Sequence, residues 1–182
     1  MKQETDDALM TRYARGDIRA FEELYDRYES RLYHFCVRQL GDVDAAADAL
    51  QEVFKRVVDA AETFQARSRL ESWIFTIARR ICVDALRSSD RGVSEHSLDR
   101  DSVPPVSSAP SPEDRLVLED ELQRLLARLP AEQREVLLLS KYHGFTYAEI
   151  AEMRSSTAVA VRQKVYRALK TLRPHVGAVR TR

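Results

Sequence analysis

The residues best suited to do chemistry lie in one amphipathic stretch, from Leu70 to Arg87. At the roughly 3.6-residue period of an α-helix, its apolar residues fall on one broad face and its arginines on the other. The apolar face carries Leu70, Ile74, Ile77, Ala78, Ile81, Cys82 and Ala85, and the polar face carries Thr76, Arg79, Arg80, Val83, Asp84 and Arg87, with Trp73 at the border. Arginine neutralises phosphates and an indole stacks on unpaired bases, so the pattern favours nucleic-acid binding. The alternatives are a solvated surface helix and a Trp73 whose ring closes the core.

This stretch resembles the promoter-melting segment of small bacterial sigma factors of the extracytoplasmic-function (ECF) group, which reads W-[LI]-F-x-I-A-R-x-x-x-x-D-x-x-R. The sequence matches it at Trp73, Ile74, Phe75, Ile77, Ala78, Arg79, Asp84 and Arg87, with Arg80 where the family often has asparagine. The resemblance implies that melted −10 promoter DNA contacts Trp73, Arg79, Arg80 and Arg87. It also implies that the preceding loop, Thr63 to Arg69, captures a flipped −10 base, with Arg67 and Ser68 as candidate contacts.

A second motif lies on the predicted helix from Val43 to Glu62. Polar residues recur on one side of this helix, at Asp48, Gln51, Glu52, Lys55 and Asp59. The order Asp48-x-x-Gln51-Glu52-x-Phe54 resembles the D-x-x-Q-E-x-F segment with which sigma factors bind the clamp helices of the polymerase β′ subunit. The resemblance implies that Asp48, Gln51, Glu52 and Phe54 bind polymerase, and an acidic stripe suits a basic partner. A merely solvated helix face is the alternative.

A third motif predicts a helix-turn-helix near the C-terminus. Thr146 and Glu149 form a capping box that starts a short helix, and a polar break precedes a longer basic helix from Thr157 to about Arg173, which Pro174 is expected to end. The segment LPAEQREVLLLSKYHGFTYAEIAE resembles sigma region 4 and also the DNA-binding domain of response regulators. The resemblance implies that the −35 element is read by Ala158, Val159, Ala160, Arg162, Gln163 and Arg167. The family's turn glycine is replaced by Ser155, which adopts a positive φ less readily.

Composition supports an all-α protein with two different partners. Apolar residues make up 44% of the 182 residues, only five are glycine, and helix-forming residues dominate. Lys plus Arg and Asp plus Glu number 29 each, but from Arg154 to Arg182 there are eight basic residues and no acidic one. This asymmetry indicates that one partner is a polyanion. Cys36 and Cys82 lie in apolar helical patterns, which favours buried free thiols and a cytosolic protein.

The chain divides into two predicted helical domains. Helices are expected at Asp6 to Ala14, Ile18 to Leu40, Val43 to Glu62, Leu70 to Arg87, Ser111 to Leu129 and Ala131 to Tyr142, followed by the helix-turn-helix. Ser88 to Ser111 holds three prolines and no helical period, which is typical of a flexible linker. The predicted domains are therefore residues 1–90, a linker at 91–112, and residues 113–182. Whether the linker threads through the RNA-exit path of polymerase or is a passive tether stays open.

These motifs, in this order, predict an ECF sigma factor. By resemblance, its partners are core RNA polymerase (the β′ clamp helices and the β flap), promoter DNA and an anti-sigma factor. We expect no catalytic site, metal, cofactor, signal peptide, membrane insertion or added sensory domain, and a cytoplasmic location. One alternative is a helix-turn-helix regulator that acts without polymerase, which leaves the first two motifs as coincidence. Another is a helical adaptor that binds only protein, which leaves the basic tail unexplained.

Overall fold

The computed structural model describes residues 4–64, 69–91 and 112–179, and every regular element in these ranges is helical. The N-terminal bundle consists of α1 (Asp6–Ala14), α2 (Ile18–Leu40), α3 (Val43–Asp59), the short 3-10 helix η1 (Ala61–Thr63) and α4 (Leu70–Arg91). The C-terminal bundle consists of α5 (Pro112–Ala127), α6 (Ala131–Leu137), the π-helical turn η2 (Leu138–Tyr142), α7 (Tyr147–Met153) and α8 (Ala158–Val179). The predicted all-α fold is confirmed.

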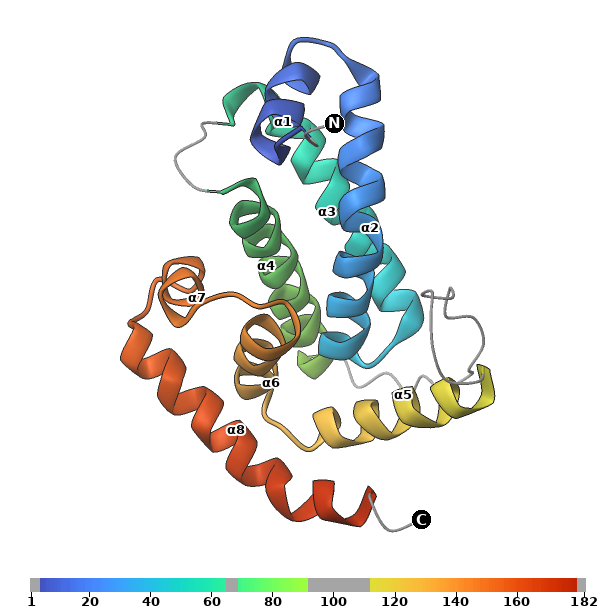
Figure 1. The fold of residues 1–182 in the computed structure, drawn as a ribbon, viewed down its shortest axis with the longest axis vertical. Helices are drawn as coiled ribbons and strands as arrows, with labels where there is room; N and C mark the ends of the chain where they lie inside the picture. The colour runs from blue at the N-terminus through green and yellow to red at the C-terminus, as the bar shows by residue number, and fades with distance from the viewer. Residues whose placement is uncertain (1–3, 65–68, 92–111, 180–182) are drawn as a thin grey trace.

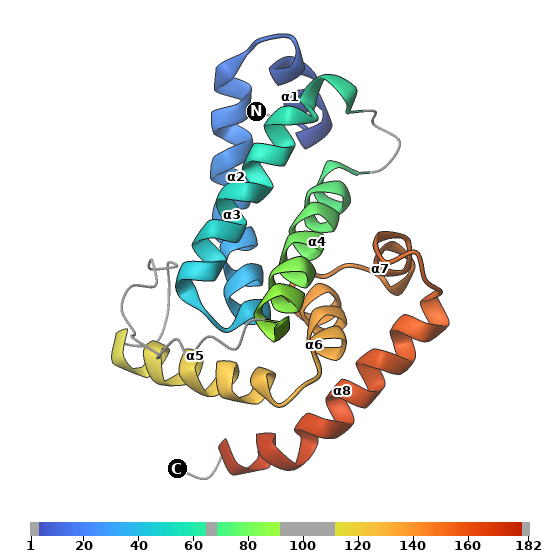
Figure 2. The same ribbon diagram turned by 180° about the vertical axis from the view of Figure 1, so that it is seen from behind.

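The helix α4 lies at the centre of the molecule (Figures 1 and 2). On one side it packs against α2 and α3, and on the other side the helices α6 and α7 of the C-terminal bundle lie beside it. The long helix α8 runs along the outside of α6 and α7. The helix predicted to bind DNA is therefore flanked by both bundles.

Local capping explains why α2 begins and ends where the sequence predicts. The carboxylate of Asp17 accepts a hydrogen bond from the Arg19 backbone N–H at 3.1 Å, which satisfies one of the free donors at the helix start. Gly41 ends the helix with φ +79°, a left-handed conformation that costs glycine little. Asp42 then caps α3 through the Ala45 N–H at 2.7 Å.

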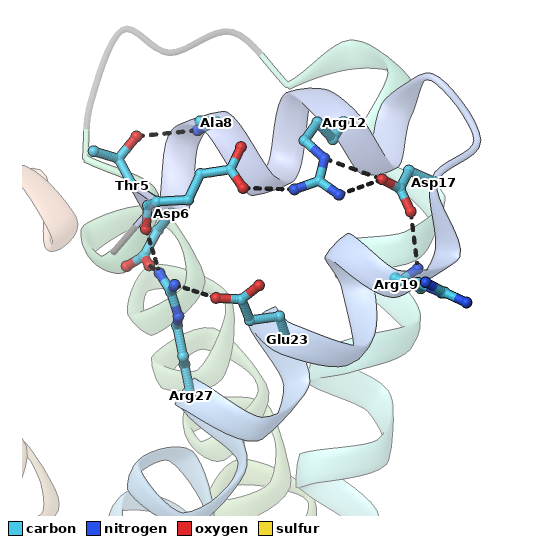
Figure 3. Close-up of polar contacts among 9 residues, drawn as sticks. Thr5, Asp6, Ala8, Arg12, Asp17, Arg19, Glu23 and Arg27 are labelled. Carbon is cyan, nitrogen blue, oxygen red and sulfur yellow. Dashed lines mark hydrogen bonds and ion pairs between the residues drawn. The ribbon is translucent and has the colours of Figure 1, made fainter. Parts of the chain in front are cut away.

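A polar network fastens α1 to α2 at the top of the N-terminal bundle (Figure 3). The Arg12 guanidinium contacts the carboxylates of Glu4 and Asp17, at 2.5 Å each, and it holds the pKa of Asp17 below its ordinary value. Arg27 of α2 reaches Asp6 of α1 at 2.5 Å. The pairing of Arg27 with Asp6 holds the first turn of α1 against α2.

The core of the N-terminal bundle includes both cysteines. Cys36 of α2 and Cys82 of α4 are free, fully buried thiols whose sulfur atoms lie 3.7 Å apart. The prediction of buried free thiols is confirmed. The hydrogen bond to Cys36, together with burial, raises the pKa of Cys82 far above its ordinary value, so this thiol stays protonated.

Two predicted boundaries in the N-terminal bundle are wrong. The helix expected from Val43 to Glu62 ends at Asp59, and η1 tightens the chain after it, as often happens at helix ends. The helix expected to end at Arg87 continues to Arg91, so the first residues assigned to the linker are helical. Ser88 is accommodated within the helix, where its hydroxyl donates back to the Asp84 carbonyl at 3.0 Å. The rest of the predicted linker, 92–111, lies outside the described residues.

Two further boundaries differ in the C-terminal bundle. Pro174 lies inside α8, which continues to Val179, so the prediction that this proline ends the helix is wrong. The φ of proline is compatible with a helix. Because proline has no backbone N–H, α8 lacks one hydrogen bond at this position and still continues beyond it. The helix expected from Ala131 to Tyr142 changes at Leu138 into a π-helical turn, in which the His143 N–H bonds the Leu138 carbonyl at 3.0 Å. Across the described ranges, no helix combines the length and apolarity needed to cross a membrane.

Candidate nucleic-acid interface

The N-terminus of α4 is capped by a residue from another helix. The Asp7 carboxylate of α1 accepts a hydrogen bond from the Leu70 backbone N–H at 3.1 Å. The first turn of an α-helix leaves such donors unpaired, so this contact fixes where α4 begins. It thereby positions Trp73 and the arginines that follow. The predicted base contacts Arg67 and Ser68 fall outside the described residues.

Trp73 has a partly structural environment. Its side chain is half-buried, and its ring lies 5.2 Å from the ring of Phe64, centroid to centroid. One part of the indole thus packs against the end of the N-terminal bundle, and the rest stays open to solvent. Both interpretations of this residue therefore have a physical basis at this position.

The three arginines of α4 have different surroundings. Arg80 and Arg87 are exposed and point away from the core, as a phosphate contact requires. Arg79 is only 17% exposed, and its Nε donates to Glu135 Oε1 of α6 at 3.0 Å. Burial lowers the pKa of this guanidinium, although arginine remains charged. Arg79 is thus occupied by a carboxylate of the C-terminal bundle.

Glu135 is a buried carboxylate with two cationic partners. It is 1% exposed and contacts both Arg79 of α4 and Arg154, the residue that follows α7. A carboxylate this deeply buried needs charged partners, because removing it from water costs several kcal/mol. Sequence periodicity did not single out Glu135, because a glutamate in the segment EQREVL looks like any charged residue on the solvated face of a helix.

The acidic-polar stripe on α3 is accessible, with one exception. Asp48 and Gln51 are exposed, and Glu52 is partly exposed while it pairs with Arg56 at 2.8 Å. Phe54 is only 7% exposed, and its ring packs 4.4 Å from that of Tyr25. The first three residues therefore present a polar face to solvent. Phe54 instead anchors that face on the bundle core.

The helix-turn-helix forms as predicted, with its capping box intact. The Thr146 hydroxyl accepts from the Glu149 N–H at 3.2 Å, and the Glu149 carboxylate accepts from the Thr146 N–H at 2.8 Å. The α7 helix ends in a Schellman motif, in which the Ser156 N–H bonds the Ala151 carbonyl at 2.8 Å. Ser155 supplies the left-handed residue of this turn, with φ +50°.

The residues predicted to read the −35 element lie at the start of α8. Ala158, Val159, Arg162, Gln163 and Arg167 are exposed, and Ala160 is half-buried. The opposite side of the helix is held in the core by the predicted line Val161, Val165, Ala168 and Leu172. The structure thus presents one continuous surface of α8, with a long polar side chain one turn inside its N-terminus. Lys164 is excluded from this surface because it pairs with Glu132 of α6.

An aromatic cluster joins α4 to the C-terminal bundle. Phe75 is fully buried, and its ring lies 4.7 Å from that of His143 and 5.1 Å from that of Phe145. Burial, with Arg31 and Arg38 nearby, lowers the pKa of His143 to about 3, so its imidazole is neutral. The sequence carried one signal for this cluster: Trp73, Ile74 and Phe75 are consecutive, which makes the apolar surface too wide for a single buried face.

Comparison with known proteins gives a consistent result over nearly the whole chain. Residues 24–92 match the family described as sigma-70 region 2, and residues 119–172 match sigma-70, region 4. The chain is 32% identical over 168 residues to the RNA polymerase sigma factor CarQ of Myxococcus xanthus, which covers 92% of the chain and 95% of CarQ. It is 29% identical over 165 residues to the ECF sigma factor SigX of Bacillus subtilis, covering 88% and 85% of the two chains.

Solved structures share the fold. CnrH, in complex with the cytosolic domain of CnrY, matches with a TM-score of 0.73 and 23% identity, over 96% of this chain and 99% of that chain. RpoE of Bartonella quintana, in complex with the anti-sigma factor NepR, matches with a TM-score of 0.71 and 23% identity, over 86% and 96%. At this identity the likeness establishes the helical architecture.

The two matched regions together define a helical DNA-binding protein of transcription. The sequence matches are more specific, because they span both regions in order and nearly the full length of the relatives. The chain belongs to the sigma-70 family of RNA polymerase sigma factors, within its ECF group. Sigma factors are transcription initiation factors and not enzymes, which agrees with the sequence-based expectation. Among the described residues, no group of three or more histidine, cysteine, aspartate or glutamate side chains is arranged to hold a metal ion.

Proposed function

We propose that this sigma factor directs promoter-specific initiation by binding core RNA polymerase through α3 and promoter DNA through α4 and α8. The observation that carries the proposal is that α3 and α4, packed side by side, expose chemically opposite faces: Asp48 and Gln51 on one, Arg80 and Arg87 on the other. A polar acidic face suits a basic protein helix, and arginines suit a polyanion. One bundle thus supports two simultaneous partners.

The DNA is bound in two places under this proposal. The −10 element, once melted, contacts α4 and the loop before it, where Trp73, Arg79, Arg80 and Arg87 supply stacking and phosphate contacts and Arg67 or Ser68 contacts a flipped base. The −35 element is duplex DNA and is read in the major groove by the exposed start of α8. The division into domains at residues 1–90 and 113–182, with a linker between them, allows the two contacts to be spaced along the promoter.

An anti-sigma factor completes the proposed set of partners, since the similar RpoE of Bartonella quintana was solved with the anti-sigma factor NepR. Core polymerase is bound at the β′ clamp helices by α3 and at the β flap by the C-terminal bundle. The site of action is the cytoplasm, where polymerase and promoters are found.

The decisive test is transcription by purified components. Core RNA polymerase with and without the chain is incubated with a library of genomic promoter fragments, and transcript 5′ ends are mapped. A sigma factor creates a set of new start sites that share −10 and −35 sequences. A regulator that acts without polymerase binds the same duplex fragments but creates no start sites with core enzyme alone, and that result would overturn the proposal.

A further inference from the structure

Two glutamates on one side of α6 hold two cations of the helix-turn-helix. Glu132 and Glu135 occupy positions i and i+3 of this helix, so they lie one turn apart on the same face. Glu135 binds Arg154, the residue that follows α7, and Glu132 lies 3.6 Å from the same guanidinium. Glu132 also accepts a hydrogen bond from Lys164 of α8, which packs beside α6 (Figure 1). One face of α6 thus contacts both the turn and α8.

The pair formed by Glu132 and Lys164 is open to solvent. The side chain of Glu132 is 66% exposed and that of Lys164 is 30% exposed, whereas only 9% of the Arg154 side chain is exposed. The hydrogen bond from Lys164 lowers the pKa of Glu132, so this carboxylate is ionised at neutral pH. An ion pair this exposed adds little to the stability of the fold. Glu132 and Lys164 can therefore be changed without unfolding the bundle.

The position of Lys164 on α8 suits a phosphate contact. Ala160 and Arg167, one turn before it and one turn after it, both belong to the proposed −35 surface. A helix in the major groove reads base edges with its central residues, and flanking cations contact the DNA backbone. A lysine whose charge is already neutralised by a carboxylate adds little attraction for a phosphate. The pairing with Glu132 thus withholds one cation at the edge of the −35 surface.

Withholding one lysine affects random DNA and a −35 element differently. Sequence-independent binding depends on the number of phosphates that cations neutralise, and each contact steepens the fall of log K with log salt by about 0.9. On random duplex, α8 is free to move to where a released lysine meets a phosphate. On a −35 element, base contacts fix the register of the helix, so the same lysine gains less. A released Lys164 therefore raises non-specific affinity more than specific affinity.

We propose that Glu132 is a positioning residue that sets DNA specificity, because it holds Lys164 away from the DNA backbone and so limits binding to random duplex. The inference rests on the proposed reading of the −35 element by α8. Glu132 does not touch DNA in this arrangement and acts through Lys164. Because promoters compete with a large excess of other sites, lower non-specific affinity favours the correct ones.

The test compares the full wild-type chain with Glu132→Gln, with Lys164→Gln and with the double variant. Glutamine keeps the shape of a glutamate side chain and removes its charge. The matched control is Glu152→Gln, which removes the same charge from an exposed position of α7. Circular dichroism checks that helix content is retained in every variant.

Fluorescence anisotropy gives the Kd on two short labelled duplexes over a series of salt concentrations. One duplex carries the −35 sequence shared by the mapped start sites, and the other is random. On random duplex, Glu132→Gln should bind about eightfold tighter at about 0.1 M salt, and its salt slope should steepen by about 0.9, the effect of one added phosphate contact. The gain on the −35 duplex should be smaller, so the ratio of the two affinities falls. Lys164→Gln should keep the wild-type slope, and the double variant should return to it.

Several results overturn this role of Glu132. A shallower slope in Lys164→Gln shows that the lysine already contacts DNA in the wild type. A double variant that keeps the gain, or an equal gain in Glu152→Gln, shows that losing a negative charge is sufficient without Lys164. Equal gains on both duplexes show that Glu132 sets affinity and not specificity. If core polymerase gives no new start sites, the sigma-factor proposal fails, while the random duplex still tests whether Glu132 withholds Lys164.

Discussion

Ser155 replaces the glycine that the family usually has in the turn between α7 and α8, and its backbone conformation there costs free energy. It is the one described non-glycine residue with a positive φ, at +50°, and it occupies the left-handed position of the Schellman motif between α7 and α8. A left-handed conformation costs an L-residue about 1–2 kcal/mol, and glycine avoids most of that cost. Glycine also loses about 0.4–1 kcal/mol through the greater freedom of the unfolded chain. We therefore expect Ser155→Gly to stabilise the protein by about 0.5–1 kcal/mol.

The assay is thermal and urea unfolding followed by circular dichroism. For a chain of this size, a change of 1 kcal/mol moves Tm by about 2–4 °C, so the expected rise is about 1–4 °C. Ser156→Gly is the matched control, because Ser156 is an exposed neighbour in the same turn whose φ is not positive. Ser156→Gly increases the freedom of the unfolded chain without relieving a left-handed conformation, so it should lower Tm.

The sign of the difference between the two variants decides the reasoning. If Ser155→Gly lowers Tm as much as Ser156→Gly does, the left-handed serine carries no strain and the turn is held by other contacts. If Ser155→Gly is stabilised and its affinity for duplex promoter DNA is unchanged, serine and glycine at this turn give the same angle between α7 and α8.

Three further outcomes test the proposed contacts. Gln51→Lys with Glu52→Lys should weaken binding to core polymerase at least tenfold with helix content unchanged, as measured by titration of labelled chain, because the stripe then repels a basic partner. Arg80→Ala with Arg87→Ala should keep core affinity but slow open-complex formation on duplex templates, and a pre-melted −10 bubble should partly restore the rate; normal opening rates would show that these arginines are only solvated. His143 has a folded pKa of about 3, below its ordinary value of 6.5, so the unfolded chain binds more protons between these pH values and stability should fall by several kcal/mol as pH drops from about 6.5 toward 3. The fall should be smaller in His143→Phe, as followed by urea unfolding across that pH range, and an equal fall would exclude this histidine as the cause.

The features that the sequence predicted well are those set by neighbours along the chain. Both ends of α2 were located to the residue because Asp17 caps one end and Gly41 takes the left-handed turn at the other. The exposed faces of α3 and α8 followed from helical periodicity in the same way. Residues whose partners come from distant segments were not predicted. Glu135 is buried because Arg79 approaches it from another bundle, 56 positions away along the chain.

Helix α4 shows why periodicity alone did not predict the carboxylate partner of Arg79. A helix with one buried face leaves all its polar residues solvated, and the 3.6-residue period was interpreted as one buried face. Because α4 packs against α2 and α3 on one side and against the C-terminal bundle on the other, Phe75 is buried on the second side and Arg79 lies at the edge of that contact. Arg80, one position further along, has turned away by about 100° and is exposed. How many neighbours a helix packs against is a tertiary property, and two neighbours leave only a narrow strip of α4 exposed.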